Sequence, residues 1–312
     1  MTNPLQITVS ASGERLDKHL AEALPSYSRA QLQQWIKAGQ VRVNDNKVGL
    51  KAGTKPHAGD VIVVDFPVEE DFRPQAEDIP LIVLYEDDDL AVIEKPAGLV
   101  VHPGAGNTTG TLVKALLSRY PQMQNMDDDE NLDEGRAGIV HRLDKDTSGL
   151  IVVAKHKEAL TNLMQQFRDR TVEKTYVALL ERTPRTLSGI VDAPIARDPK
   201  FRQKMSVIAR GRDAITEFAV TDHNFPGGQV LVTLTPRTGR THQIRVHMAF
   251  IGCPIAGDTV YGLRRKMPGL NRHFLHAAGL VFDQPTTGER LSFASPLPLE
   301  LLSVVELLRE KA

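Results

Sequence analysis

The charged segment at residues 141–149 has the residue types that could perform chemistry. Two carboxylates, Asp144 and Asp146, lie among the cations Arg142 and Lys145, and an apolar run follows directly. A carboxylate held among cations where a strand begins is typical of sites that use an ionised Asp as a nucleophile or electrostatic partner. On charge pattern alone, a solvated turn between two strands is the commoner explanation. Other segments of the chain must decide between the two.

Three further segments carry residues of chemical interest. Residues 95–106 contain three glycines and two prolines, which favour a rigid, irregular backbone that can approach another surface closely. Residues 173–176 open an expected strand and end at Tyr176. Residues 238–248 lead into an expected helix that carries Arg245, because apolar residues recur there at helical spacing.

The length and composition bound the class of protein. The chain has 312 residues, enough for two domains. Its single cysteine, Cys253, excludes an intramolecular disulfide and a cysteine-only metal cluster, and it fits a reducing compartment. The N-terminus lacks the features of a signal peptide, and no apolar stretch approaches the ~20 residues of a membrane span. We therefore expect a cytoplasmic protein without a membrane partner.

The charge is unevenly distributed along a nearly neutral chain. The net charge is −1, yet residues 67–100 carry ten acidic and two basic side chains. Residues 197–212 carry one acid against six cations, which are Arg197, Lys200, Arg202, Lys204, Arg210 and Arg212. Such segregation can make a basic face that attracts phosphate, although a solvated loop would show the same composition.

Residues 1–66 form an expected small module of two helices and a short sheet. One helix follows Arg15 and is broken at Pro25, and a second begins after Ser28 in a capping-box pattern. The pieces Arg15-Leu-Asp-Lys-His-Leu, Tyr27-Ser-Arg-Ala and Val41-Arg-Val-Asn44 resemble an S4-type RNA-binding domain. That resemblance implies phosphate contacts from exposed cations, for which Arg29, Lys37 and Arg42 are the candidates. Trp35 shares the apolar face of its helix, which favours a core position over base stacking.

The rest of the chain is expected to be a second domain. Residues 67–80 have the composition of a linker, and residues 81–312 contain more strands than helices. Strands are expected near 82–85, 90–93, 151–154, 175–180 and 230–235, and helices at 110–119, 157–169, 242–251 and 298–310. Because the strands do not alternate regularly with helices, we predict an α+β fold with a mixed, largely antiparallel sheet. Residues 124–135 are expected to form a flexible acidic surface loop.

The segments together resemble the RluA-type pseudouridine synthases, in the right order over roughly residues 80–300. The matching pieces are residues 141–149, Lys95-Pro to Pro103-Gly104, Lys174-Thr-Tyr176 and Gly239-Arg-Thr-His-Gln-Ile-Arg-Val-His247. The resemblance implies an isomerase that detaches a uracil in RNA, turns it and rejoins it to the ribose through carbon. It also implies no cofactor and no metal.

The resemblance implies roles for individual residues. Asp144 is the expected catalytic carboxylate, attacking the ribose or abstracting a ribose proton, and Arg245 is its expected cation partner. Tyr176 is expected to stack on the base and to take part in proton transfer. Substrate contacts are expected from His141, Arg142, Arg240 and Ile244, with Arg142 filling the gap left by the extruded base. Asp146 is expected to hold the turn.

The implied partner is large-subunit ribosomal RNA, at a hairpin loop, or an assembling pre-ribosomal particle. Lys200, Arg202 and Lys204 are expected to add phosphate contacts, and the enzyme is expected to be a monomer. One rival is a non-catalytic assembly factor, against which the set Asp144, Tyr176 and Arg245 argues. Another is a metal-dependent hydrolase that uses the histidines, but the five-residue spacing of His242 and His247 does not place two ligands on one helix face.

Overall fold

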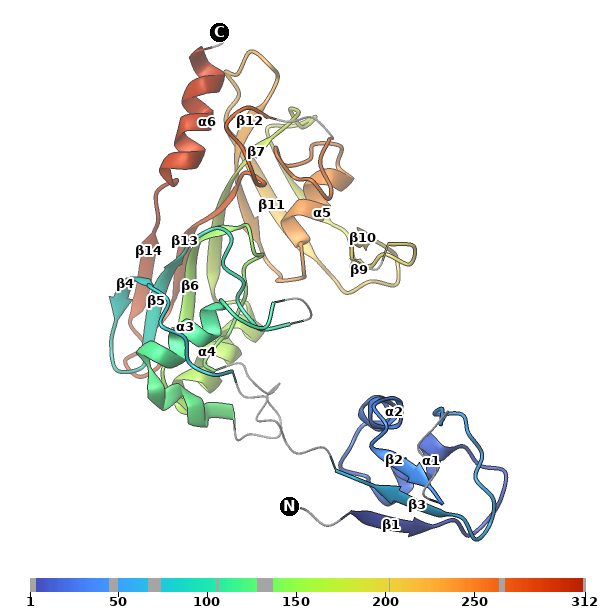
Figure 1. Cartoon of the computed structure of the whole chain (residues 1–312). Helices are drawn as coiled ribbons and strands as arrows, with labels where there is room; N and C mark the ends of the chain where they lie inside the picture. Colours follow the sequence, from blue (N-terminus) through green and yellow to red (C-terminus); the bar gives the residue numbers. More distant parts are fainter. Residues whose placement is uncertain are drawn as a thin grey trace. The chain divides into compact units, whose positions relative to one another are not determined.

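The computed structural model describes residues 4–44, 50–66, 74–104, 107–127, 137–201, 203–263 and 267–310 (Figure 1). The chain divides into two compact units, Met1–Phe72 and Arg73–Ala312, each with its own core. Of the predicted linker, residues 67–73 lie outside the described residues. In the remainder, Glu77 forms an ion pair with Lys114 at 2.7 Å, so this part is attached to the second unit.

The N-terminal unit has the two helices and the short sheet that were predicted, and the sheet gains a third antiparallel strand, β1, that was not. Its sheet has the order β1-β3-β2, with β1 at Leu5–Thr8, β2 at Val41–Val43 and β3 at Val61–Val64. The helices are α1 (Leu16–Ala23) and α2 (Arg29–Lys37). Their apolar faces and the sheet share a small core of Val9, Leu16, Leu20, Leu32, Ile36, Val41, Ile62 and Val64.

Local signals set the bounds of α2 as the sequence predicted. The Ser28 hydroxyl accepts from the Gln31 backbone N–H, and the Gln31 side chain accepts from the Ser28 backbone N–H, which completes a capping box. Gly39 follows the helix with φ +76°, a conformation that favours glycine. Trp35 is half-buried and its ring lies 4.7 Å from that of Tyr27, centroid to centroid, which fits the predicted core position.

The second unit is built on a nine-stranded sheet. Its strand order is β4-β5-β6-β13-β7-β12-β11-β8, with β14 also paired to β13. Only the β6–β13 pair is parallel among the described strand pairs of this sheet, which confirms the predicted mixed, largely antiparallel sheet. The strands are β4 (Ile82–Glu86), β5 (Leu90–Lys95), β6 (Ser148–Ala154), β7 (Glu173–Leu180), β8 (Ser188–Asp192), β11 (Ile215–Asp222), β12 (Val230–Pro236), β13 (Leu275–Asp283) and β14 (Arg290–Ala294).

Helices cover the two halves of this sheet separately. In Figure 1, α3 (Leu112–Arg119) and α4 (Lys157–Asp169) lie beside the β5–β6 half, where they share a core with those strands. Helix α5 (Gln243–Phe250) packs against β11 and β12 in the other half, next to the small β9–β10 hairpin. Helix α6 (Leu299–Glu310) completes that second core. The strands of the hairpin are β9 (Ile195–Arg197) and β10 (Met205–Val207).

The centre of the sheet brings the chemically interesting segments together. Strand β13 lies between β6, which the charged segment enters, and β7, which carries Tyr176. Gly149 makes the close β6–β13 approach possible: it has φ +113°, and a Cβ there would lie 2.2 Å from the Ala277 carbonyl oxygen. The two halves of the site are therefore one strand apart.

Several elements differ from the sequence expectations. Strands β1, β8–β11, β13 and β14 were not predicted. The acidic surface loop expected at 124–135 is wrong over residues 124–127, which belong to the 3₁₀ helix η1 (Pro121–Asp127). Met123 and Met126 of this helix are buried in the core against α3 and β6, so apolar burial fixes the segment despite its acidic neighbours. Residues 128–136 lie outside the described residues.

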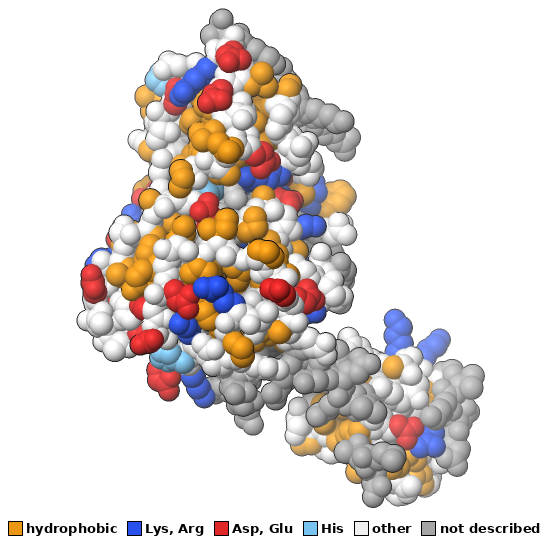
Figure 2. Space-filling model, turned by 60° about the vertical axis from the view of Figure 1, so that its left-hand side comes forward, with side chains coloured by type: hydrophobic (Ala, Val, Ile, Leu, Met, Phe, Trp, Pro, Cys, Tyr) orange, Lys and Arg blue, Asp and Glu red, His pale blue; other side chains and the backbone are white. Residues whose placement is uncertain are grey.

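Figure 2 shows apolar side chains spread over one face of the molecule, among scattered charges. Among the described residues, the exposed large apolar side chains include Ile82 and Leu84 of β4 and Leu299 of α6. Strand β4 is at an edge of the sheet, so one side of its backbone has no neighbour among the described strands. Separately, none of the helices in the described part of the chain combines the length and apolar character that crossing a membrane requires.

Candidate active site

A cavity of about 600 Å³ lies where the charged segment, the end of α4, strand β7 and the start of α5 meet. Its wall has one carboxylate among the described lining residues, Asp144. Eight cations line the same cavity: Arg142, Arg168, Arg170, Lys174, Arg212, Arg237, Arg240 and Arg245. A single carboxylate in a concave, strongly cationic pocket suits an anionic ligand and one negatively charged reacting group.

Asp144 is connected to a buried chain of charges. The Arg245 guanidinium donates to Asp144 Oδ2 through Nη1 at 3.0 Å, and it donates to Asp258 through Nε at 2.7 Å and Nη2 at 2.9 Å. Arg245 and Asp258 are buried, whereas Asp144 is partly exposed to the cavity. Arg245 thus bridges a structural carboxylate and the one in the pocket, which a planar fork of five donors can do.

The pKa values follow from this arrangement. Burial opposes the charged form of Arg245, but hydrogen bonds to Asp258, its charge and that of Asp144 raise the pKa of the guanidinium above its usual value. Burial likewise opposes ionisation of Asp258, yet Arg245 and the backbone N–H groups of Tyr261 and Val260 hold its pKa below the usual range. Both groups are therefore charged at neutral pH, and Arg245 presents a fixed cation to Asp144.

The turn before α5 fixes where Arg245 points. The Gln243 side chain accepts from Thr238 Oγ1 (2.7 Å) and from the Arg240 backbone N–H (3.0 Å), and it donates to Ile215 O and Thr216 Oγ1. His242, which precedes the helix, has φ +57°, an uncommon conformation for a residue other than glycine. A strained backbone conformation of this kind persists only where the surrounding contacts hold it in place. Such conformations are frequent at functional sites.

His242 lies between the pocket carboxylate and a partly buried tyrosine, Tyr261. Its Nδ1 is 2.8 Å from the Tyr261 hydroxyl, and its Nε2 is 4.0 Å from Asp144 Oδ1. The Tyr261 oxygen also accepts from the Met205 backbone N–H at 2.8 Å. Burial lowers the pKa of His242, so it is largely neutral at pH 7. At 4.0 Å the imidazole lies beside the carboxylate without a direct hydrogen bond to it, so it lines the site without adding charge.

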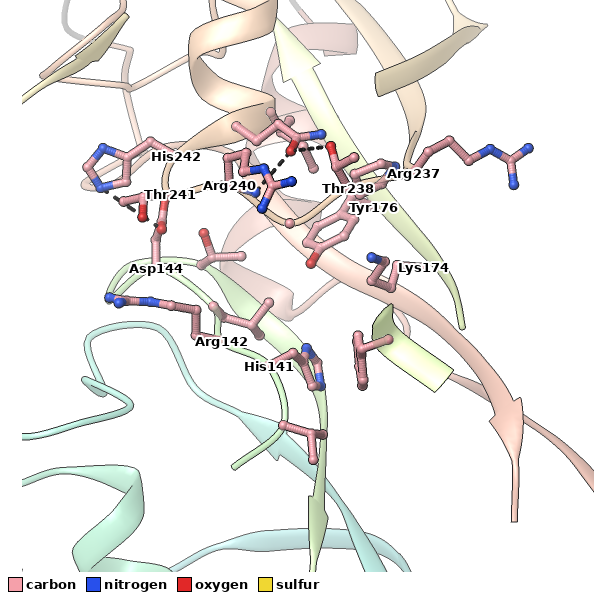
Figure 3. Close-up of a pocket in the computed structure, with 18 of the residues that line it drawn as sticks. His141, Arg142, Asp144, Lys174, Tyr176, Arg237, Thr238, Arg240, Thr241 and His242 are labelled. Carbon is pink, nitrogen blue, oxygen red and sulfur yellow. Dashed lines mark hydrogen bonds and ion pairs between the residues drawn. The ribbon is translucent and has the colours of Figure 1, made fainter. Parts of the chain in front are cut away.

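Strand β7 supplies the facing wall of the pocket. Lys174 and Tyr176 are two residues apart and point to the same side of the strand, as Figure 3 shows. Burial, with the nearby charge of Asp144, raises the pKa of the Tyr176 phenol, which is therefore protonated at neutral pH. Burial, with the charge of Arg170, lowers the pKa of the Lys174 ammonium to about 8. The Lys174 ammonium and the Tyr176 hydroxyl both face the cavity.

Buried cations hold the charged segment from behind. Lys95 Nζ donates to the carbonyl oxygens of Pro96 (2.9 Å), Leu99 (2.9 Å) and Lys145 (3.0 Å). Arg272 donates to Asp146 O and to Ser148 Oγ, both at 3.0 Å. The segment is thus anchored through its backbone and Ser148, which leaves the Asp144 side chain free to face the pocket.

The structure brings together the seven catalytic and substrate-binding residues predicted from the sequence: all line the cavity. Ile244 is buried at 6% exposure, and Arg142 is exposed at the mouth. Arg240 Nε donates to the Asp213 carbonyl at 3.0 Å. His141 Nε2 accepts the Val152 backbone N–H at 3.0 Å. Whether these residues touch substrate stays a prediction.

Burial dominates the setting of His141. Its ring stacks on Phe167 at 4.8 Å, and burial together with the Lys174 charge lowers the pKa of His141 to about 3. One ring nitrogen is already engaged by backbone, so the residue has a clear structural role in addition to its place in the pocket wall. His247, weighed above as a ligand, is hydrogen-bonded through both ring nitrogens, to Thr216 and to Ala193 O.

The predicted phosphate contacts have mixed surroundings. In the N-terminal unit, Arg29 is bonded to Asp17 at 2.8 Å and Arg42 to Asp65 at 2.6 Å, while Lys37 is exposed. In the second unit, Lys204 Nζ donates to Val260 O at 2.8 Å and Lys200 is exposed, whereas Arg202 lies outside the described residues. Their contacts with RNA stay predictions.

Sequence reasoning missed Asp258, His242 and Tyr261 as site residues. Asp258 follows an apolar run and lies three residues before Tyr261, a weak signal for a buried carboxylate. Sequence reasoning also did not assign Lys174, Arg168, Arg170 or Arg237 to the site. Arg212 was named only as part of the basic segment at 197–212, and the structure places it in the cavity wall. In the N-terminal unit, Glu14, His19 and Glu22 offer donor atoms within 4.8 Å of one another; exposed groups of this kind are common without an ion.

Comparisons with known proteins identify the family and the fold. The model of the RNA pseudouridylate synthase family matches residues 89–250, and that of the S4 domain matches residues 14–62. The chain therefore belongs to the RNA pseudouridylate synthase family and isomerises uridine to pseudouridine in RNA. Both resemblances predicted from the sequence are confirmed.

Similar proteins share nearly the whole chain. The Bacillus subtilis protein described as uncharacterized RNA pseudouridine synthase YlyB is 43% identical over 312 residues, covering 99% of each chain. Ribosomal large subunit pseudouridine synthase D of Vibrio parahaemolyticus is 41% identical over 313 residues, covering 96% of this chain and 93% of that protein. The solved structure of human RNA pseudouridylate synthase domain containing 1 has a TM-score of 0.57 and 28% identity, covering 73% of this chain and 89% of that one.

Proposed function

We propose that the enzyme modifies uridines in a hairpin loop of large-subunit ribosomal RNA, with Asp144 as its catalytic carboxylate. The observation that carries the catalytic assignment is the Asp258–Arg245–Asp144 chain, which ends in the one carboxylate among the described residues that line a cavity with eight cations. The RNA class rests on the near full-length similarity to proteins named ribosomal large subunit pseudouridine synthase D. The partner is that RNA, free or in an assembling particle.

The site is suited to a uridine turned out of the RNA. A base inside a stack cannot reach a concave pocket, so extrusion at a cost of a few kcal/mol comes first. Tyr176 stacks on the flipped uracil, and Ile244 is the apolar residue on its other side. Arg142, exposed at the mouth, fills the gap left in the RNA. His141 and Arg240 in the wall complete the contacts with the nucleotide.

Asp144 then acts at the ribose, either on its C1′ atom or by taking a ribose proton. Arg245 orients this carboxylate through the hydrogen bond from Nη1 and places a fixed positive charge beside it. The proton-bearing Tyr176 phenol is placed for the proton transfer that follows. The cations Arg29, Lys37, Arg42, Lys200, Arg202 and Lys204 hold the RNA backbone. The enzyme works as a monomer in the cytoplasm, where ribosomes assemble, and needs no cofactor.

The test combines mapping and substitution. Pseudouridine would be mapped across ribosomal RNA in a strain that lacks this gene, then in the same strain carrying the wild type or Asp144→Asn. We expect the unmodified positions to lie in a hairpin loop of the large-subunit RNA, to regain pseudouridine with the wild type, and to stay unmodified with Asp144→Asn. Asp144→Asn should bind the RNA within a few-fold of wild type. Appreciable turnover by that variant would remove the catalytic role of Asp144.

The same experiment decides against a non-catalytic assembly factor. If the ribosome-assembly defect of the deleted strain were corrected equally well by Asp144→Asn, the scaffold and not the chemistry would be what the cell uses. Loss of pseudouridine with no change at large-subunit positions would instead place the substrate in another RNA.

A further inference from the structure

Lys174 is a cation in the pocket wall with no role so far. It is the second residue of β7, two residues before Tyr176; its side chain is half-buried and its Nζ faces the cavity (Figure 3). Among the described residues its ammonium group has no hydrogen-bond acceptor and no ion-pair partner; the Phe167 ring centroid lies 5.7 Å from Nζ. A desolvated ammonium without an acceptor is costly, so it indicates a partner that arrives with the substrate.

The other pocket cations are either engaged or exposed. Arg245 is bound to two carboxylates, Arg237 to Glu217 at 2.8 Å, and Arg240 to a backbone carbonyl. Arg168 donates to Gln165 at 3.1 Å, while Arg142, Arg170 and Arg212 are exposed to solvent or partly so. Lys174 therefore differs from the rest because it is withdrawn from water yet has no acceptor of its own among the described residues.

The reaction creates a charge that such a cation can meet. When the C1′–N1 bond breaks, its electron pair leaves with the uracil, which becomes an anion delocalised over N1, O2 and O4. The ring then turns, C5 bonds to C1′, the C5 proton leaves, and N1 takes up a proton. No atom or electron is gained or lost overall. The anion exists only between the two bond changes, so a group that stabilises it accelerates the reaction rather than merely binding substrate.

The spacing on β7 fits a base that contacts both residues. Side chains two apart on a strand lie about 6.5 Å from each other on one face. A uracil stacked on the Tyr176 ring can therefore turn one edge toward Lys174 Nζ.

We propose that Lys174 donates a charge-assisted hydrogen bond to a carbonyl oxygen of the flipped uracil and stabilises the uracil anion. The proposal rests on the function proposed above, since it requires a uridine in this pocket. The oxygen is O2 or O4, and the two are separated by experiment. Lys174 is then a catalytic residue that touches the base, with Asp144 acting on the sugar side.

The first test compares Lys174→Met, Lys174→Arg and the matched control Arg168→Met, which removes a pocket cation from an exposed helix position. Single-turnover loss of tritium from C5 is measured on a ribosomal RNA hairpin that the wild type modifies. Lys174→Met should be slower by about 10²–10³-fold, the usual cost of removing one group that stabilises a developing anion. RNA affinity should stay within a few-fold, and Lys174→Arg should stay nearer to wild type. Arg168→Met should weaken affinity and its salt dependence, and it should slow the rate at saturation far less than Lys174→Met does.

The second test finds the oxygen. Hairpins carrying 2-thiouridine or 4-thiouridine at the target position replace one carbonyl oxygen by the weaker acceptor sulfur. The thio substitution at the contacted position should slow the wild type and leave Lys174→Met unchanged, so the two changes are not additive. If both sulfurs affect the two enzymes equally, the contact does not exist.

The pH dependence of the single-turnover rate separates a catalytic role of Lys174 from a purely structural one, because only a catalytic role links the rate to protonation of its ammonium. The titratable groups lining the cavity with Lys174 are His102, His141, Asp144, Tyr176 and His242, together with the seven arginines of the cavity wall named above. The pKa of His141 is about 3, that of His242 is below its usual value, and that of the Tyr176 phenol is above it. The pKa of Lys174 is about 8, so the wild-type rate should fall as pH rises past that value. Lys174→Arg should lack this fall.

The outcomes separate the two proposals. A wild type that is inactive on every RNA tested would refute the proposed function, and the proposed contact of Lys174 with uracil would fall with it. An active wild type with an equally active Lys174→Met would refute the inference alone. Parallel loss of rate and affinity, with a shallower salt dependence, would make Lys174 a phosphate contact and overturn the proposed contact with the base.

Discussion

At the scale of single residues, the site depends on how one arginine is shared. Arg245 uses Nε and Nη2 for Asp258 and Nη1 for Asp144. The buried Asp258 therefore fixes the position of the guanidinium, and the guanidinium in turn orients Asp144 in the pocket. Asp258 also accepts the backbone N–H groups of Val260 and Tyr261 at 2.9 and 3.0 Å. The protein thus fixes the cation before any substrate arrives, which is the preorganisation that electrostatic catalysis needs.

Replacing Arg245 by Lys should reveal this geometry, because an ammonium keeps the charge but lacks the planar fork that bridges two carboxylates. We expect Arg245→Lys to lower the single-turnover rate by about 10²-fold or more, the scale seen when one preorganised donor is removed. RNA affinity should stay within a few-fold. A rate close to wild type would show that charge alone suffices and that the bridge is incidental.

At the scale of elements, the order of the strands in the sheet brings together motifs that lie far apart in the sequence. The charged segment and Tyr176 are about thirty residues apart in sequence, yet β13, which follows both, inserts between β6 and β7 and sets their separation. The turn before α5 is fastened by Gln243 to β11, so Arg245 arrives from the opposite half of the sheet. Each element carries one part of the site, and the sheet sets the distances among them.

Strong local signals explain which elements could be predicted. Apolar runs such as Leu90–Lys95 and Ser148–Ala154 are strands buried on both faces, and the Ser28 capping box marks a helix start. Strand β13 was missed because His276 and Gly279 interrupt its apolar pattern; His276 is nevertheless buried, bonded to Ser148 and to Ser295 O. Tertiary pairing decides such a segment, and sequence periodicity does not show it.

Site residues could be predicted from the sequence only where they lie in a recognisable family motif. Asp144, Tyr176 and Arg245 were found because their segments match a family, and they do line one cavity. Asp258 was missed because a buried carboxylate in an apolar stretch has no local signature until its arginine partner is known. The cations at the end of α4 were missed for the same reason, since only the fold brings them to the pocket.

The N-terminal helices provide a stability prediction. Asp17 is fully buried and accepts from Arg15 at 2.9 Å, Arg29 at 2.8 Å and Gln33 at 2.7 Å, so it joins α1 to α2. Hydrogen bonds from Arg15 in particular hold the pKa of Asp17 well below its usual value, despite burial. Asp17→Asn should destabilise this unit by about 1.5–3 kcal/mol, the scale of hydrogen bonds to a charged group, because the partner arginines are half-exposed and remain solvated. Chemical denaturation followed by the fluorescence of Trp35, the chain's one tryptophan, would measure it.

The same residue sets a pH dependence with a definite sign. An acid whose pKa is lower in the folded state stabilises the fold above its unfolded pKa of about 3.9 and loses that contribution as pH falls below it. The Trp35 transition of the wild type should therefore move to lower denaturant as pH drops below about 4, and that of Asp17→Asn should move less. An equal shift in both proteins would assign the acid sensitivity to other groups.

At the scale of the whole molecule, a net charge of −1 hides two regions of opposite sign. The acidic stretch at 67–100 and the eight cations of the cavity belong to different parts of the chain, so the field at the pocket is positive although the protein is nearly neutral. Such a field draws an RNA backbone toward the site while limiting attraction elsewhere. Affinity should then depend on salt, and the S4 domain should add to that dependence.

Deleting residues 1–72, the N-terminal unit, tests how the two units share this work. Removal of one phosphate-binding cation should reduce the slope of log affinity against log salt by about 0.7–0.9. We expect weaker binding, a shallower slope and less selective choice of uridine, with an unchanged rate at saturating hairpin because the catalytic groups belong to the second unit. Lys37→Gln, a single exposed cation, is the matched control and should lower the slope by no more than the amount for one cation. Unchanged affinity and slope after the deletion would mean that the S4 domain does not hold this RNA, and that the cations around the cavity alone bring it to Asp144.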